Sequence, residues 1–531
     1  MFTSRSKGNG VDRRLLLKGA AAGLLATSCT TTLHPRIVGA DHALGHQLRS
    51  RSFPPAEPGP KLGALIIGSG AAGCAAAYTL QKAGHGDFQI LDLAIDAGGN
   101  ARAGHHGNIS YPWGAHYLPQ PDRSNQDLLQ FLADCGAIKS WNATGEAEYN
   151  EDYICHDMEE RLFYQGSWHE GLIPWKSLDA GTVSELKAFT AFTDRLRQER
   201  GKDGRLAFQI PLDRSSHDSA YKKLDSMTFA AFIRGQGWHS PFLTWYLNYA
   251  CRDDYGTDWE ETSAWAGLHY FAARSGENGK VLTWPEGNHW LIRQLLRGIE
   301  SKFQGGELVH AVKRVGESWQ IESWNEKLAV NRLWTADKLI LAVPRHVSAR
   351  LLPGLAYDRN QMTYAPWMVA NLQVKSLPEG GEGTELAWDN VPYGSPSLGY
   401  VVASHQEIKR YQGPSVLTSY WPLTGGSSDY LRSIAGMRSA DDWGRMVLAD
   451  MEAMHPDYVP NIEKIDVWLW GHGMIQPKPG HLWGAGRAAL NEQPYPKHIL
   501  AQAHSDMSGI SIFEEAFGRG VDAARQILKG S

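Results

Sequence analysis

The feature that most constrains the fold of this chain is a glycine-rich loop between two apolar segments. Residues 64–80 read ALIIGSGAAGCAAAYTL, which places Gly68, Gly70 and Gly73 at the spacing G-x-G-x-x-G. The run GALII before the loop has the β-branched content of a buried strand, the alanine-rich segment after it is typical of a helix ending near Gly84, and DFQILDL reads as a second strand. This order of strand, tight loop, helix and strand predicts a Rossmann-type α/β unit.

Each glycine of the loop has a physical role in binding a diphosphate. Gly68 makes the turn, Gly70 lets the backbone approach the pyrophosphate, and Gly73 lets the helix pack on the strand. The helix begins at Ala71 and Ala72, where free N–H groups and a partial positive charge favour an anion. The loop therefore predicts a dinucleotide site.

A carboxylate and a second glycine pair follow the loop. Asp92 ends the second strand about 20 residues after the loop, where it can accept hydrogen bonds from both hydroxyls of an adenosine ribose. NAD and FAD share this half of a site. In AIDAGGNARAG, Gly98 and Gly99 provide a second backbone segment that can approach the same diphosphate. An NAD-binding Rossmann protein is the alternative, but it leaves the C-terminal segment described below unexplained.

From this glycine pair onward the sequence resembles the flavin-containing amine oxidase superfamily, which also includes phytoene desaturases and protoporphyrinogen oxidases. The family shows G-G-R and then a second arginine; here Asn100 replaces the first arginine and Arg102 matches the second. The stretch YPWGAHYLP resembles the strand that brings Gly114 and Ala115 to the flavin. The resemblance thus implies an altered diphosphate clamp and FAD as the cofactor.

Two later segments extend the resemblance to the end of the chain. GELVHAVKRV and DKLILAVP are similar to the strands in which the backbone of a valine, here Val312, contacts adenine. HSDMSGISIFEEAFGRGVDAARQIL is similar to the closing segment, in which Asp506 matches the acid that holds the ribityl chain. Phe513 and Glu514 match the start of the last helix, whose N-terminus stabilises negative charge on the reduced flavin.

The resemblance implies an α/β fold with a Rossmann-like FAD-binding domain and a discontinuous, mixed α+β substrate domain. Helical runs such as DLLQFLADCGAI and strand-like runs such as MVANLQV separate the nucleotide-binding segments. We expect a signal peptide at 1–40, the FAD-binding domain at 60–120, 281–345 and 491–531, and the substrate domain at 121–280 and 346–490.

The predicted substrate domain supplies the candidate catalytic residues. The chain has 20 tryptophans, and aromatic walls suit an apolar or cationic substrate beside a flavin. Amine oxidases place a lysine on the strand after the AVP segment, and the resemblance puts Asn371 at that position, which argues against a standard reaction with dioxygen. Trp470, His116 and His472 are the other candidates, although core packing or a structural hydrogen bond also explains each of them.

These features predict an FAD-dependent oxidoreductase that moves a hydride from a substrate C–H bond, next to an amine nitrogen in the leading interpretation, to the flavin. One alternative is a desaturase or dehydrogenase of an apolar or polyene substrate. Another is a flavin-carrying binding or assembly protein with little turnover. The partner is a small molecule, and the electron acceptor, dioxygen or a quinone, stays open.

The N-terminal segment predicts export. RRLLLK, beginning at Arg13, resembles the twin-arginine signal, and the apolar stretch after it is too short for a membrane span. The resemblance implies export of a folded, cofactor-loaded protein to the periplasm or another extracytoplasmic compartment, with no transmembrane domain in the mature chain. Cleavage after Ala40 is favoured, and a lipid anchor at Cys29 is the alternative.

Charge and cysteine content limit the remaining classes. A net charge of -5 gives no basic stripe of the kind that binds nucleic acid. Cys74, Cys135, Cys155 and Cys251 show no metal-binding spacing and are expected to be buried thiols, with a disulfide as the alternative. We therefore expect no metal, and the adjacent His105 and His106 are weak evidence for a metal or a covalent flavin.

Overall fold

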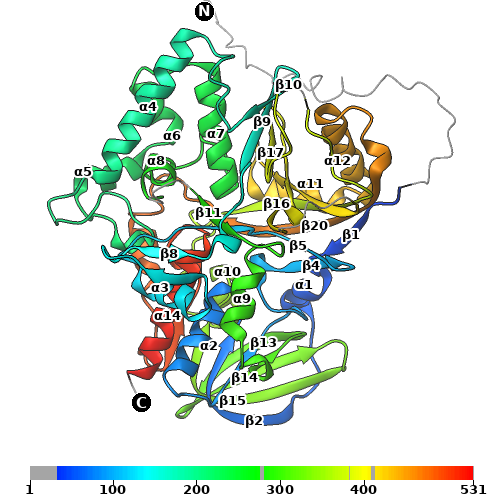
Figure 1. Cartoon of the computed structure of the whole chain (residues 1–531). Coiled ribbons are helices and arrows are strands. Elements are labelled where there is room, and N and C mark those ends of the chain that lie inside the picture. Colours follow the sequence, from blue (N-terminus) through cyan, green and yellow to red (C-terminus); the bar gives the residue numbers. More distant parts are fainter. Residues whose placement is uncertain (1–32, 275–279, 382, 408–412, 530–531) are drawn as a thin grey trace, which may run out of the picture. The chain divides into compact units, whose positions relative to one another are not determined.

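The glycine-rich loop lies at the end of a central strand in a seven-stranded sheet (Figure 1). The computed structural model describes residues 33–274, 280–381, 383–407 and 413–529. The strand order in this first sheet is β12-β3-β2-β15-β14-β13, and β21 pairs with β15 outside this path. Its strands are β2 (Glu57–Ile67), β3 (Phe88–Leu91), β12 (Phe303–Gln304), β13 (Glu307–Val315), β14 (Ser318–Asn325), β15 (Val330–Leu341) and β21 (Leu500–Gln502).

The parallel part of the first sheet confirms the predicted α/β fold. Strands β2 and β3 are parallel and joined by α2 (Ala71–Lys82), and β2 also pairs in parallel with β15. The C-terminal helix α14 (Phe513–Leu528) packs against α2, and a Cβ on Gly520 would lie only 2.1 Å from the carbonyl oxygen of Ala72. The small residues of the last helix therefore allow it to approach the helix that follows the loop.

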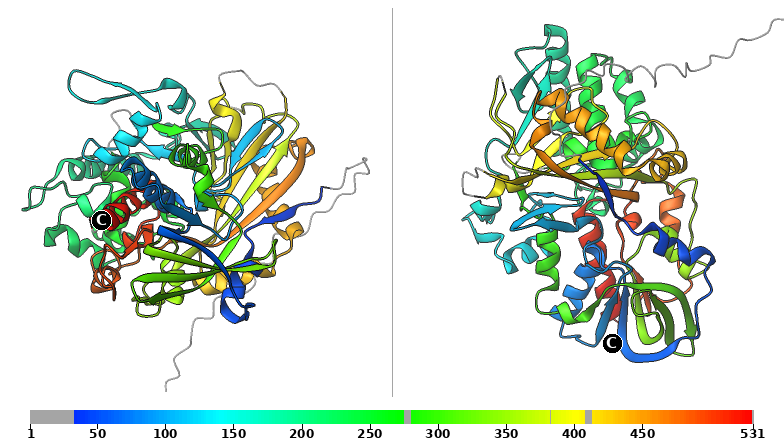
Figure 2. Two further views of the ribbon diagram at one scale, coloured as in Figure 1. Left: turned by 90° about the horizontal axis from the view of Figure 1, so that it is seen from below. Right: turned by 90° about the vertical axis from the view of Figure 1, so that its right-hand side faces the viewer.

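A second, eight-stranded sheet has the order β1-β20-β16-β19-β18-β17-β9-β10. In the right-hand view of Figure 2 its long strands, yellow to orange, lie between the green helices and the strands of the first sheet. Its strands are β1 (Arg36–Gly39), β9 (Glu160–Tyr164), β10 (Ser167–Glu170), β16 (Tyr364–Val374), β17 (Asp389–Pro392), β18 (Tyr400–Val402), β19 (Ser415–Pro422) and β20 (Ile462–Ile475).

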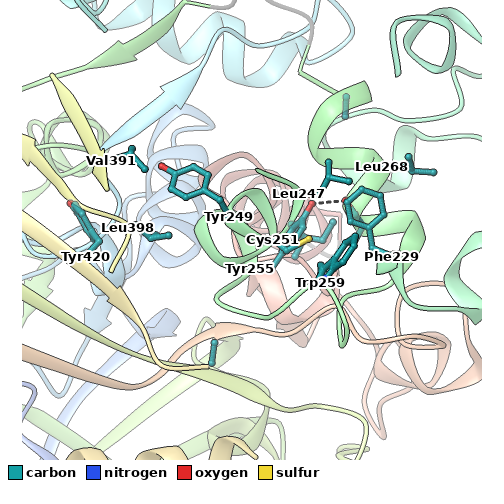
Figure 3. Packing of buried hydrophobic residues seen from close by; sticks show 14 of the residues in the cluster. Phe229, Leu247, Tyr249, Cys251, Tyr255, Trp259, Leu268, Val391, Leu398 and Tyr420 are labelled. Carbon is teal, nitrogen blue, oxygen red and sulfur yellow. Dashed lines mark hydrogen bonds between the residues drawn. The ribbon is translucent and has the colours of Figure 1, made fainter. Parts of the chain in front are cut away.

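A layer of helices joins this second sheet through a continuous apolar core. Helix α7 carries both core residues and, near its C-terminal end, residues of the site described below. Figure 3 shows Tyr249 of α7 between the helices and the sheet residues Val391 and Tyr420. The hydroxyl of Tyr255 donates a hydrogen bond of 2.8 Å to the carbonyl of Ala266 in α8. The layer consists of α4 (Ala180–Gln198), α6 (Phe229–Gly235), α7 (Pro241–Tyr255) and α8 (Ala264–Ala272).

The remaining strands and helices lie outside the two large sheets and the helical layer. They are α1 (His42–Ser50), β4 (Ala103–His106), β5 (Ile109–Pro112), β6 (Tyr117–Pro119), α3 (Gln126–Asp134), β7 (Ile138–Trp141), β8 (Ala147–Tyr149), α5 (Ser219–Lys222), β11 (Val281–Thr283), α9 (His289–Leu296), α10 (Arg345–Leu351), α11 (Ser428–Met437), α12 (Ala440–Met454) and α13 (Ala485–Leu490). Within the described residues, no helix combines the length and the apolar character needed to span a membrane.

The N-terminal strand lies inside the range predicted to be a signal peptide. Strand β1 pairs in parallel with β20, and Arg36 forms an ion pair of 2.9 Å with Asp466. The folded unit begins at His34, so cleavage after Ala40 would remove an edge strand. The arginine pair, the apolar stretch and Cys29 lie outside the described residues.

The four described cysteines are free thiols. Cys74, Cys155 and Cys251 are buried, and Cys135 is half-buried. Burial raises the pKa of the Cys135 thiol to about 11. Because burial disfavours the thiolate, these side chains have packing roles rather than reactive ones.

Candidate functional site

The glycine loop has the geometry of a ligand cradle. Gly68 has a φ of 103°, and a Cβ there would lie 2.3 Å from the carbonyl oxygen of Ala342. A Cβ on Gly73 would lie 1.9 Å from the carbonyl oxygen of Gly68, so the helix packs directly on the turn. A Cβ on Gly70 would meet only the Cα of Gly99, at 4.0 Å. Two of the glycines thus hold the loop, and Gly70 faces space that a ligand can occupy.

This space belongs to a cavity with an empty volume of about 1500 Å³. Eleven of the residues predicted to bind the cofactor line it. They are Gly68, Gly70, Ala71, Ala72, Asp92, Gly98, Gly99, Arg102, Ala115, Asp506 and Phe513. We call this space the nucleotide cavity.

The second glycine pair closes the cradle from the opposite side. Gly98 and Gly99 both have positive φ, and Gly98 forms a parallel bridge with Gly70. Arg102 lines the same cavity, and its Nε is a buried donor without an acceptor. Burial lowers the pKa of Arg102. A diphosphate would supply both the missing acceptor and the compensating charge.

Asp92 lines the nucleotide cavity next to the glycine loop. Its Oδ2 accepts hydrogen bonds from the backbone N–H and the hydroxyl of Ser69, at 2.6 and 2.7 Å. These bonds hold the carboxylate beside the loop. Glu307 also lines the cavity, and its N–H donates to the carbonyl of Asp92 at 2.8 Å. Sequence reasoning missed Glu307, which stands at the start of β13.

The structure does not place Val312 among the residues that line the nucleotide cavity. Val312 is buried in the same apolar cluster as Val309, and Leu308 and Val309 line the cavity instead. The pairing of β13 with β14 shifts between Val309 and Ala311, which marks a bulge. Because a bulge breaks the alternation of side chains, residues beyond it cannot be assigned to a face by simple counting.

Asp506 lines the far part of the nucleotide cavity as an ionised acceptor. Its Oδ2 accepts from the N–H of Arg345 at 2.7 Å and from the hydroxyl of Tyr364 at 2.6 Å, and Oδ1 lies 3.1 Å from Nδ1 of His504. Burial opposes ionisation, but the charge of His504 and the hydrogen bonds hold the pKa at about 2. An ionised carboxylate that lines the cavity fits a ligand hydroxyl.

A second cavity, with an empty volume of about 1030 Å³, adjoins the first. The two cavities share lining residues and so meet at a common boundary. A planar group held at this boundary would face both spaces. The shared residues are Asn100, Ala115, Gly473, Ser511, Ile512 and Phe513. Helix α14 starts at this boundary, and no side chain caps its first N–H groups. We call the second space the substrate cavity.

Aromatic side chains form much of the substrate cavity. His116 stacks on Tyr420 with 4.6 Å between ring centroids, and the Tyr420 hydroxyl donates to the carbonyl of Gly114 at 2.9 Å. Burial lowers the pKa of His116 to about 4, so the ring is neutral at physiological pH. Trp470 lines the cavity and donates to the carbonyl of Trp113 at 2.7 Å.

Four carboxylates also line this cavity, and sequence reasoning identified only Glu514. Asp253 and Asp254 come from the C-terminal end of α7 and Asp389 from the start of β17. Asp254 forms an ion pair with Arg274. The acidic run around Asp253 was a visible signal, but nothing in the sequence placed it against β17.

The proposed roles of Asn371 and His472 need correction. Asn371 lines neither cavity. Its Nδ2 donates to the carbonyl of Pro112 at 3.1 Å and its Oδ1 accepts from Thr418 at 2.6 Å, so both amide groups are occupied. The residues of β16 that line the substrate cavity are Trp367 and Val369.

His472 lines the nucleotide cavity rather than the substrate cavity. Its ring stacks on that of His346, with 4.6 Å between the centroids. Burial lowers the pKa of His472 to about 3, so it is a neutral group. It belongs with the residues that could contact a cofactor.

Comparisons with known proteins agree with this geometry. Residues 66–135 match the family model of the NAD(P)-binding Rossmann-like domain. No curated protein matches the chain. Putrescine oxidase bound to putrescine is similar over 89% of this chain and 100% of its own, with a TM-score of 0.63 and 14% identity.

Two further solved structures show the same similarity. Cyclohexylamine oxidase from Brevibacterium oxydans IH-35A has a TM-score of 0.63 at 15% identity, covering 89% of this chain and 99% of its own. A CLA-producing fatty acid isomerase from P. acnes has a TM-score of 0.60 at 17% identity, covering 87% and 97%. Similarity at these identities shows the shared fold, because one fold can carry different chemistries.

Proposed function

We propose that this chain is an FAD-dependent oxidoreductase that oxidises an amine at the carbon next to nitrogen. The nucleotide cavity supports FAD because it offers a cradle open at Gly70, a buried Arg102 Nε without an acceptor, and an ionised Asp506. Bound there, FAD would supply a two-electron acceptor for hydride.

The single observation that carries the amine assignment is the substrate cavity, which combines aromatic faces with buried carboxylates and adjoins the nucleotide cavity. Ring faces and carboxylates both attract a cationic ligand. Trp470 and Tyr420 line this cavity, where their rings would pack against the alkyl part of the substrate.

Glu514 supports the proton transfer that amine oxidation requires. It lines the substrate cavity directly after Phe513, and burial raises its pKa to about 7. A carboxylate with this pKa can accept a proton at Oε from a bound ammonium at neutral pH. The amine then carries the free electron pair that allows the neighbouring C–H bond to lose hydride.

Anaerobic mixing of the purified flavoprotein with a panel of amines and apolar compounds tests the proposal. We expect loss of the oxidised flavin absorbance with at least one amine. Bleaching by fatty acids or polyenes alone would favour the second candidate, an enzyme that acts on an apolar substrate, which the aromatic wall and the similarity to the fatty acid isomerase support. A flavoprotein that no compound bleaches would favour a binding or assembly role. Protein that cannot be loaded with FAD but binds NAD would overturn the cofactor assignment.

The proposal includes export by the twin-arginine route to the periplasm or an equivalent compartment. It rests on the sequence RRLLLK at the N-terminus. Replacing Arg13 and Arg14 with lysine keeps the charge but removes the guanidinium pair, so the flavoprotein should stay in the cytoplasm. Unchanged export of the double variant would remove this part of the proposal. The electron acceptor, dioxygen or a quinone, is identified by comparing reoxidation rates with each.

A further inference from the structure

The substrate cavity carries more negative than positive charge. Among the described residues that line it, the carboxylates are Asp253, Asp254, Asp389 and Glu514, and Arg274 is the only lysine or arginine. The ion pair with Asp254 engages this arginine. The remaining carboxylates therefore face the cavity without an equal number of cations.

Asp253 and Asp389 form the least compensated part of this wall. Neither has a lysine or arginine within ion-pair distance in the part of the chain that the structure describes. The Tyr117 hydroxyl hydrogen-bonds to Asp253, which orients the carboxylate but adds no charge. Asp389 pairs in register with Glu160 on the neighbouring strand β9, which places a third carboxyl beside the first two.

Without a ligand, the ionised forms of Asp253 and Asp389 are unfavourable. Burial, and then the charge of Asp254, raise the pKa of Asp253 to about 7, although Arg274 opposes the shift. Burial, and then the charges of Asp253 and Glu160, raise the pKa of Asp389 well above its usual value. Buried carboxylates that repel one another ionise readily only when a cation lies between them.

An organic cation fits this position better than a metal ion. No three His, Cys, Asp or Glu side chains in the described residues converge closely enough to hold a metal. Tyr249 and Tyr420 line the same cavity as these carboxylates. Figure 3 shows Tyr249 between the helices and the sheet residue Tyr420. Aromatic rings beside separated carboxylates suit an ammonium group on an alkyl chain.

We propose that the substrate is a linear diamine or polyamine whose distal ammonium lies between Asp253 and Asp389, while the reacting nitrogen lies at the boundary with the nucleotide cavity. This inference rests on the proposed function and names its substrate class. The two ends of the substrate need different protonation states, because the distal nitrogen stays protonated and the reacting nitrogen must lose its proton.

The reaction is balanced at the reacting end. The carbon loses hydride to the flavin, the nitrogen lone pair forms a C=N bond, and the resulting iminium adds water to give an aldehyde and an ammonium ion. The distal ammonium does not change. Its contacts should therefore affect binding more than the rate of the chemical step.

The test compares butylamine with the diamine of the same carbon chain. Anaerobic flavin bleaching is measured against concentration for the wild-type protein, Asp389→Asn and Asp253→Asn. The control is Asp337→Asn, on β15 of the first sheet, whose side chain is 51% exposed. We expect the wild-type protein to reach half-maximal bleaching at a diamine concentration at least about tenfold below that of the monoamine, since each well-placed charge contact adds a factor of this size.

The Asp389→Asn and Asp253→Asn variants should lose most of this preference, with little change in the limiting rate for either amine, and the control should keep it. If the wild-type protein reached half-maximal bleaching at equal concentrations of the two amines, the inference would be overturned and the proposed function would stay intact. Failure of both amines to bleach the flavin, with bleaching by another class of compound, would instead remove the proposed function.

A ligand that cannot react separates binding from turnover. A bis-quaternary ammonium of the same chain length has no nitrogen lone pair, so it can occupy the cavity without being oxidised. We expect it to raise the melting temperature of the wild-type and Asp337→Asn proteins but not that of Asp389→Asn. If the Asp389→Asn protein folds and the dication stabilises it as much as the wild type, the inference is also overturned.

Discussion

The two cavities differ in the kinds of residues that line them. Glycine, alanine and backbone groups form much of the nucleotide cavity, whereas tyrosine, tryptophan and aspartate side chains dominate the substrate cavity. Backbone geometry at Gly68 and Gly70 follows from local sequence, because only glycine allows the turn and the close approach. Side chains such as Asp253 and Asp389 meet only after the whole fold has formed. A short motif can therefore encode the glycine cradle of the first cavity, whereas the second cavity has no such local signature.

The largest expected effect tests whether the nucleotide cavity depends on one open glycine. Gly70→Val places a side chain in the cradle where no protein atom lies closer than 4.0 Å to the Cβ, so the protein should fold but bound FAD should fall below about a tenth of the wild-type content. Absorbance of the purified protein and released FAD measure this. The control, Gly436→Val, has no atom within 4 Å of its Cβ and lies far from both cavities on α11. Full FAD occupancy in Gly70→Val would show that the loop is not the cradle.

The next effect concerns Asp506, a carboxylate of the nucleotide cavity whose pKa is lowered to about 2. Asp506→Asn removes a charged acceptor, so FAD affinity should fall by about tenfold to a hundredfold. Titration of the apoprotein with FAD, followed by flavin fluorescence, measures the dissociation constant. Asp337→Asn should leave it unchanged. An Asp506→Asn protein with wild-type affinity would place Asp506 outside the ligand contacts.

The same carboxylate affects stability in acid. Its folded pKa of about 2 lies below the usual value of 3.8, so its contribution is present above pH 3.8 and is lost as the pH falls towards 2. The difference corresponds to about 2 kcal/mol. Unfolding by urea at several acidic pH values should show this loss in the apoprotein and not in Asp506→Asn, and parallel curves for the two proteins would contradict it.

The substrate cavity should show the opposite pH dependence. Asp253 and Glu160 have folded pKa values raised to about 7, so the stability of the ligand-free protein should fall as the pH rises from about 4 through 7. A bis-quaternary dication favours the ionised forms, and its affinity should increase by about tenfold between pH 6 and 8. Calorimetry at the two pH values measures this. A flat affinity would separate the carboxylates from ligand binding.

The smallest expected effect comes from the N-terminal edge strand, outside both cavities. A chain that begins at Asp41 loses β1, including the contact of Gly39 with the Trp468 ring, and should unfold about 1–3 kcal/mol more easily than one that begins at His34. Arg36→Ala should cost about 1 kcal/mol or less, because this arginine is 56% exposed and Lys464 also pairs with Asp466. Thermal unfolding compares the three chains. If mass spectrometry showed that the exported protein begins at Asp41, the mature protein would lack β1.

Local sequence predicted the elements whose geometry is local. The strand β2, the start of helix α2, Asp92 and the second glycine pair were all placed correctly in the α/β fold. Val312 was misplaced because the cavity ends before it: Val309 lines the cavity, whereas Val312, farther along β13, packs in the same apolar cluster without reaching it. A pattern of alternating residues carries no sign of where along a strand a cavity ends.

The misplacement of Asn371 has a different physical cause. Trp367, Val369 and Asn371 all belong to β16, but the carbonyl of Pro112 and the hydroxyl of Thr418 cover the last of them. Only the tertiary packing decides where along a strand a cavity ends. For the same reason, sequence reasoning could not find Asp253 and Asp389, which come from a helix and a strand more than a hundred residues apart.

The nucleotide cavity draws on residues from Gly45 to Ala516 of a 531-residue chain. A ribosome has therefore made most of this chain before the last wall of the cradle exists. On the proposal that FAD binds here, a partly synthesised chain lacks some of its contacts, so loading would follow their synthesis and would occur in the compartment where the full chain first folds. If the chain is exported in its folded form, the cytoplasmic supply of FAD sets how much active protein reaches the other side.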